Sequence, residues 1–202
     1  MSTHHRQIMQ RREALLRVSA LSLGLAAPLA PGLAAAQAAA DDKTYDEDSV
    51  LRAATDFFGQ TAEGLAKVIE KAFKEQGRPN GFIRGEEASA AITVGVRYGE
   101  GELVLKSGET AKVFWAGPSI GFDLGANASK VFVLVYQLPR ADDIYKRYAG
   151  VDGSLYYLGG VGMNYQRRGS VVLAPIRLGV GLRSGASVGY VHYRREKTFN
   201  PL

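Results

Sequence analysis

From Pro79 onward, short runs of β-branched and aromatic residues are interrupted by glycine every few positions. Glycine inside a strand weakens it, unless the backbone must bend there or approach another chain segment closely. Repeated bends of this kind let a small sheet close on itself, and closure hides the edge strands that an open sheet exposes. The interior glycines of the expected strands are Gly95, Gly121, Gly159, Gly160, Gly162, Gly179, Gly181 and Gly189.

The strand pattern predicts a mainly β fold, a small antiparallel β-barrel of about eight strands. Short connections favour antiparallel neighbours, and a barrel of this size is filled by side chains or holds one small ligand. An open sandwich is the alternative. A short inserted helix is expected over about 140–148, after Pro139. The expected strands are 81–85, 88–98, 102–106, 111–116, 119–124, 130–137, 155–166, 170–180 and 186–195, with turns at Gly99-Glu100-Gly101, Ser107-Gly108, Gly125-Ala126-Asn127 and Arg168-Gly169.

Two helices are expected before the strands, within residues 49–77. Ser49 is the predicted cap of the first, which ends at Gly59, and Thr61 is the predicted cap of the second, over about 62–76. The polar face of the second helix mixes both signs of charge, which favours docking on the core over lying on a membrane. Its apolar stripe is Leu65, Val68, Ile69, Ala72 and Phe73.

Residues 1–36 have the three parts of an export signal: a basic start, an apolar stretch and a small-residue cleavage site near Ala36. Arg11-Arg12 resembles the pair of a twin-arginine signal, and the ordinary Sec route is the alternative. Either route predicts a periplasmic protein. A flexible leader over 37–48 and a single domain over 49–202, with its β-barrel at 79–202, would follow.

Composition excludes several kinds of chemistry. The chain has no Cys, and His192 is the only His beyond the signal, so thiolate and multi-His metal sites are excluded and no cofactor is expected. The net charge of +5 comes largely from the arginines of the signal, so nucleic-acid binding is not indicated.

One motif suggests a hydrolase, but its context does not. Residues 117–121 read Gly-Pro-Ser-Ile-Gly, yet a nucleophilic serine in this motif needs a strand-to-helix turn, and the sequence after Ser119 continues as a strand. The adjacent pair Glu86-Glu87 would point to opposite faces of a strand, so it does not make a paired-carboxylate site by proximity. We therefore predict that the protein is not an enzyme.

A series of longer motifs follows in a fixed order along the chain: PNGFIRGEEA at 79–88, VRYGEGEL at 96–103, VFWAGPSIGFD at 113–123, LVYQLP at 134–139, GVDGS at 150–154, GGVG at 159–162, GYV at 189–191 and FNP at 199–201. This order closely resembles the EipA family, envelope-integrity proteins of alphaproteobacteria that carry a domain of unknown function. The resemblance spans about residues 45–202 and implies a soluble periplasmic eight-stranded β-barrel that supports the cell envelope, without established catalytic residues.

Five segments, at residues 98–103, 115–119, 133–136, 150–154 and 159–162, follow one another in an order that more distantly resembles SYLF lipid-binding domains. This resemblance implies an anionic phospholipid as a ligand. More generally, we expect a protein that supports the envelope by holding an envelope lipid or glycan precursor. An adaptor that binds an envelope protein partner is the alternative function.

The candidate ligand-binding residues follow from these expectations. Trp115, Phe122 and Tyr98 would give apolar stacking surfaces, while Arg97, Arg167 and Arg168 would hold an anionic head group. Phe114, Tyr136 and Tyr157 are further aromatic candidates. The alternative is that most of these aromatic residues fill the barrel core.

Overall fold

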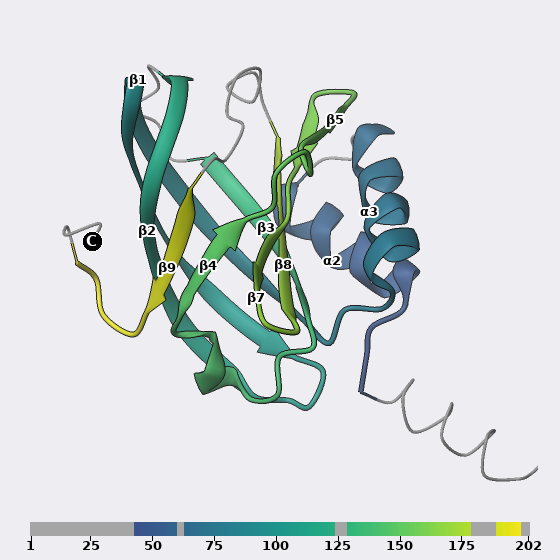
Figure 1. Cartoon of the computed structure of the whole chain (residues 1–202). Helices are drawn as coiled ribbons and strands as arrows, with labels where there is room; N and C mark the ends of the chain where they lie inside the picture. Colours follow the sequence, from purple (N-terminus) through teal and green to yellow (C-terminus); the bar gives the residue numbers. More distant parts are fainter. Residues whose placement is uncertain (1–42, 60–62, 124–128, 179–188, 199–202) are drawn as a thin grey trace, which may run out of the picture. The chain divides into compact units, whose positions relative to one another are not determined.

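The computed structural model describes residues 43–59, 63–123, 129–178 and 189–198, within a compact unit of residues 35–202. It shows a closed antiparallel β-barrel with two helices on one side of the sheet (Figure 1), so the predicted fold is confirmed. No helix in the described ranges is long and apolar enough to cross a membrane.

The first helix, α2 (Glu47–Phe58), begins three residues earlier than a helix capped by Ser49 would. Its cap is Asp46 and not Ser49, because the Asp46 carboxylate accepts hydrogen bonds from the Ser49 backbone N–H and hydroxyl, both at 2.8 Å. Gly59 ends the helix at φ 73°, a left-handed conformation that suits glycine. Tyr45, expected in the flexible leader, is ordered and packs on Phe82 with ring centroids 5.3 Å apart.

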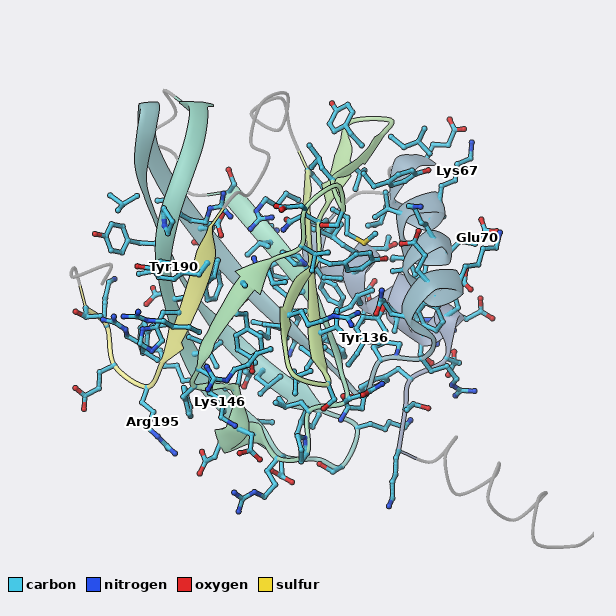
Figure 2. All side chains as sticks on the ribbon, viewed as in Figure 1. Lys67, Glu70, Tyr136, Lys146, Tyr190 and Arg195 are labelled. Atoms are coloured by element: carbon cyan, nitrogen blue, oxygen red, sulfur yellow. The ribbon has the colours of Figure 1, made fainter. Side chains whose placement is uncertain are left out.

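The second helix, α3 (Glu63–Gln76), ends as predicted, with the Gly77 N–H donating to the Phe73 carbonyl at 2.9 Å. Its predicted cap, Thr61, lies outside the described residues. Lys67 and Glu70 extend from α3 into solvent, whereas Tyr136 lies between the helices and the sheet (Figure 2). The apolar stripe of α3 therefore docks on the domain core, as the mixed charges on the opposite face of this helix indicated.

Within the described residues, nine strands form the sheet in the order β3-β1-β2-β9-β4-β7-β8-β6-β5, and β3 also pairs with β8, which closes it. All the pairings are antiparallel. A 3₁₀ helix over Ala141–Ile144 precedes β4. The strands are β1 (Gly81–Leu105), β2 (Thr110–Asp123), β3 (Ser129–Tyr136), β4 (Arg147–Gly150), β5 (Tyr156–Leu158), β6 (Val161–Met163), β7 (Gln166–Arg168), β8 (Val171–Leu178) and β9 (Tyr190–Arg194).

Strand β1 serves as two strands of the barrel. Residues 81–87 pair with β3 and residues 91–104 pair with β2. The two halves lie against each other, because the Lys106 N–H donates to the Asn80 carbonyl at 2.9 Å and Gly101 lies next to Gly85. Strands β6 and β7 pair with successive parts of β8 and act as one interrupted strand. Strand β5 pairs only with β6 and lies outside the closed ring, so the described barrel counts eight strands.

Three predicted boundaries were wrong for identifiable reasons. Gly99-Glu100-Gly101 is not a turn but lies inside β1, where Gly101 allows a close approach to the Arg84 carbonyl. The predicted strand 155–166 is broken by Gly159 and Gly160, whose φ values of 56° and 81° turn the chain between β5 and β6. The predicted helix 140–148 stops at Ile144, because β4 pairs with β7 and β9 instead.

Two hydrophobic cores lie on opposite faces of the sheet. Alternation along β1 sends Ile83 into the barrel and Phe82 to the outer face, under the helices. Tyr148 and Tyr193 help to fill the barrel interior, where their rings meet edge to face at 5.6 Å. Apolar side chains therefore occupy much of the barrel interior. The polar side chains that share this interior form part of the candidate site.

Candidate functional site

The single tryptophan of the chain, Trp115, lies in the barrel interior on β2 and is only 4% exposed. Its indole packs against Gly99 and approaches Gly85, two positions where a Cβ atom would overlap the ring. The indole also lies close to the ring of Tyr193, at 5.7 Å between ring centroids. The two glycines of β1 thus form the slot that admits the indole.

Glu87, on β1, is the buried acceptor at the centre of this region. The Trp115 Nε1–H donates to Glu87 Oε2 at 3.0 Å, and Arg177 donates through Nε and Nη2 at 3.0 and 3.1 Å. Arg97 Nε lies 3.3 Å from Glu87 Oε1. Two arginines from β1 and β8 therefore surround one carboxylate inside the barrel.

Electrostatics keep this carboxylate charged. Burial alone would raise the pKa of Glu87, but the charges of Arg177 and Arg97 and the hydrogen bonds from Arg177 and Trp115 outweigh it and lower the pKa to about 2. The pKa of Arg177 is raised: its burial acts to lower it, and the Glu87 charge overcomes that effect. The cluster carries one positive charge more than it carries negative charges.

The polar chain continues from Arg177 to Asn164, whose Oδ1 accepts from Arg177 Nη1 at 3.2 Å. Nearby Gln166 on β7 is 2% exposed, and its side-chain oxygen has no hydrogen-bond partner among the described residues. It lines a void of about 10 Å³ with Arg97, a volume that matches one water molecule. The void that Arg97 and Gln166 line is itself too small for anything larger than a water molecule.

A larger cavity, of about 350 Å³, opens on the other side of Glu87 and Trp115. Such a volume is in the range of small-molecule sites, and its wall is largely apolar. The lining comes from both halves of β1, from β2, and from the segment at and after the end of β9. The lining residues are Glu86, Glu87, Ala88, Tyr98, Gly99, Glu100, Phe114, Trp115, Ala116, Arg194, Glu196, Lys197 and Thr198.

The structure brings only some of the predicted ligand-binding residues together. Tyr98 and Trp115 line the cavity, whereas Arg97 is buried against Glu87. Arg167 and Arg168 are exposed on β7, and neither lines the cavity. The side chain of Phe122 lies outside the described residues. Among the further aromatic candidates, Phe114 lines the cavity, Tyr136 is buried under the helices and Tyr157 is exposed.

Sequence reasoning missed Glu87, Arg177 and the cavity residues that follow β9. The inward alternation of Ile83, Gly85 and Glu87 would have placed the carboxylate inside the barrel. Arg177 is likewise the one charged residue in the otherwise apolar strand β8. The sequence therefore did contain a signal for this site, in the form of two charged residues at inward-facing strand positions.

Ser119 of the hydrolase-like motif lies on a strand, and His192 accepts hydrogen bonds from two arginines. Residues 117–121 are part of continuous strand β2, so no strand-to-helix turn presents Ser119, whose side chain lies outside the described residues. His192 Nδ1 accepts from Arg194 Nε at 3.1 Å and from Arg147 Nε at 3.5 Å. Partial burial and these two arginines lower the pKa of His192, which fits a neutral, structural acceptor.

A family model described as envelope integrity protein A, EipA, matches residues 43–202. The chain belongs to the EipA family. A crystal structure of a "beta-barrel-like, uncharacterized protein" from Brucella abortus is 46% identical, with a TM-score of 0.73. The match covers 79% of this chain and 99% of that protein.

Membership in the EipA family confirms the main resemblance found in the sequence. The family match and this structural neighbour do not bear on the more distant resemblance to SYLF domains, which stays a prediction. No match was found among curated proteins. The family name indicates a role in envelope integrity.

Proposed function

We propose that this protein is a non-enzymatic periplasmic protein that supports the cell envelope by binding an amphipathic envelope molecule in the cavity over Trp115. The observation that carries the proposal is the cavity itself: about 350 Å³, with a largely apolar wall and charged residues around it. Apolar pockets with a few polar groups are typical small-molecule sites. The export signal expected over residues 1–36 supports the periplasmic location.

Support for a non-enzymatic role comes from the groups nearest the cavity. Glu87 is held by two arginines and an indole, so it is not poised to exchange a proton near neutral pH. The described residues contain no group of three or more His, Cys, Asp or Glu side chains placed to hold a metal ion. The proposed task is therefore to hold a molecule and not to transform it.

The predicted anionic lipid is the ligand that the arginine positions support least. Arg97 is committed to Glu87, and Arg167 and Arg168 lie away from the cavity. The lining instead includes the carboxylates of Glu86, Glu100 and Glu196. We therefore propose an amphipathic ligand without restricting it to an anionic head group.

An adaptor function is the second candidate, because three large apolar side chains are exposed between β4 and the end of β5. Val151, Leu155 and Tyr157 are 39%, 41% and 43% exposed. Exposed apolar side chains of this kind suit contact with a protein partner in the envelope. Pull-down of cell-wall machinery that is lost on Leu155→Ser and Tyr157→Ser, while no lipid co-purifies, would favour this function.

Native mass spectrometry of protein purified gently from periplasm tests the binding proposal. We expect a bound small molecule on the wild-type protein and its loss in Ala88→Phe, because Ala88 lines the cavity and a benzyl group would fill part of it. Ala149→Phe is the matched control, since Ala149 is an exposed strand residue outside the cavity. A bare protein mass in all three samples would contradict the proposal.

A further inference from the structure

The two walls of the cavity over Trp115 carry different charges. From β1, Glu86 and Glu100 contribute only carboxylates. From the end of β9 and the segment beyond it, Arg194 and Lys197 contribute two cations beside the single carboxylate of Glu196. The mouth of the cavity is thus dipolar, with a negative wall on β1 and a net positive wall opposite.

The protein's own charges meet across this opening. Lys197 Nζ lies 3.8 Å from Glu100 Oε2, and the two side chains are 62% and 50% exposed. An exposed pair at this distance is weak and can be exchanged for other partners at little cost. A ligand carrying one cation and one anion could replace this pair and still leave every charge with a partner.

The charges behind the wall do not change this conclusion. Glu87 also lines the cavity, but Arg97 and Arg177 already neutralise it from inside the barrel. The buried cluster holds two arginines and one glutamate, so its net charge is +1. The rim of the cavity holds three carboxylates and two cations, so its net charge is −1. The balance gives neither a purely anionic nor a purely cationic head group a general advantage.

We propose that the cavity binds a zwitterionic lipid-like amphiphile, with an ammonium group facing the β1 wall and a phosphate facing Arg194 and Lys197. Its apolar chain would lie along the wall formed by Tyr98, Phe114 and Trp115. This inference rests on the proposed function and names the class of ligand for the same cavity. Charge complementarity of this kind selects between ligands more than it raises affinity.

Trp115 allows a direct test, because it is the only tryptophan of the chain and lines the cavity. The full protein is titrated below micelle-forming concentrations with four decyl amphiphiles that differ only in head group: phosphocholine, maltoside, phosphate and trimethylammonium. Tryptophan fluorescence reports binding, and far-UV circular dichroism confirms that the protein stays folded. We expect decylphosphocholine to bind about tenfold more tightly than any of the other three, which corresponds to about 1.4 kcal/mol.

Rim variants separate head-group recognition from binding of the chain. Lys197→Gln and Glu100→Gln should each weaken decylphosphocholine binding about three- to fivefold and leave decyl maltoside binding unchanged. Lys146→Gln is the control, since Lys146 is an exposed lysine outside the cavity.

Each other outcome overturns a distinct claim. Equal or tighter binding of the phosphate, trimethylammonium or maltoside amphiphile would overturn the zwitterion proposal while leaving the cavity as a binding site. Unchanged decylphosphocholine binding in both rim variants would also overturn it. Failure of all four amphiphiles to bind would overturn the proposal together with the proposed function.

Discussion

Trp115 Nε1 donates a 3.0 Å hydrogen bond to Glu87 Oε2, and this contact joins the wall of the cavity to the charged centre of the barrel. The same carboxylate accepts from Arg177, so the position of the indole depends on an ion pair between β1 and β8. Several consequences of this arrangement can be measured on the folded protein without knowing its ligand.

Glu87→Gln should lower the free energy of unfolding by roughly 3–5 kcal/mol, because it leaves Arg97 and Arg177 buried without a counter-charge. Urea unfolding measures this change. Glu86→Gln is the matched control, since Glu86 is the exposed neighbour on the same strand and should change stability by less than about 0.5 kcal/mol. Similar effects of the two substitutions would refute the buried ion-pair cluster.

Acid should remove the stabilisation that Glu87 provides. Its pKa in the folded protein is about 2, below the ordinary value of 4.5, so the stabilisation is complete above about pH 4.5 and is lost as the pH falls toward 2. The shift corresponds to roughly 3 kcal/mol. Unfolding free energies of wild type and Glu87→Gln, measured from pH 6 to pH 2, should converge in acid. Parallel curves would show that Glu87 does not titrate as proposed.

Gly99→Ala should destabilise the barrel by about 1–3 kcal/mol, because the added methyl group would overlap the Trp115 ring. The test is a double-mutant cycle with Trp115→Leu, which removes the ring. In the Trp115→Leu background, Gly99→Ala should cost much less. An equal cost in both backgrounds would mean that Gly99 is required for a reason other than space for the indole.

Asp46→Ala should cost about 1 kcal/mol through loss of the α2 cap. Ser49→Ala should cost less, since the Ser49 backbone N–H would still be present to bond Asp46. Thermal unfolding of the two variants shows which of the two side chains contributes more to stability. A larger loss from Ser49→Ala would restore Ser49 as the cap that the sequence suggested.

The sequence predicted the barrel because its strongest signals were local and repeated. The apolar stripe of α3 and the turn at Gly108 depend on residues near one another in the chain, and both are present in the structure. Some boundaries failed because contacts between residues distant in the chain decide them. Gly99 resembled part of a turn because only the position of Trp115, on another strand, explains why glycine is needed there.

The candidate site was predicted less completely than the fold. Tyr98 and Trp115 were identified from residue type alone, and both line the cavity. Arginine at positions 97, 167 and 168 looked equivalent in the sequence, but in the structure Arg97 is buried and pairs with Glu87, whereas Arg167 and Arg168 are exposed. The 90 residues between Glu87 and Arg177 hid the ion pair, because no local pattern links two strands that far apart.

The most direct test of the central claim is a crystal structure of the protein purified gently from periplasm. The proposed function predicts electron density for an elongated molecule in the cavity, in contact with Trp115 and Tyr98 and passing beneath Lys197. A cavity closed by its own side chains, in protein that still supports the envelope, would contradict the claim that ligand binding at this site is what the protein does.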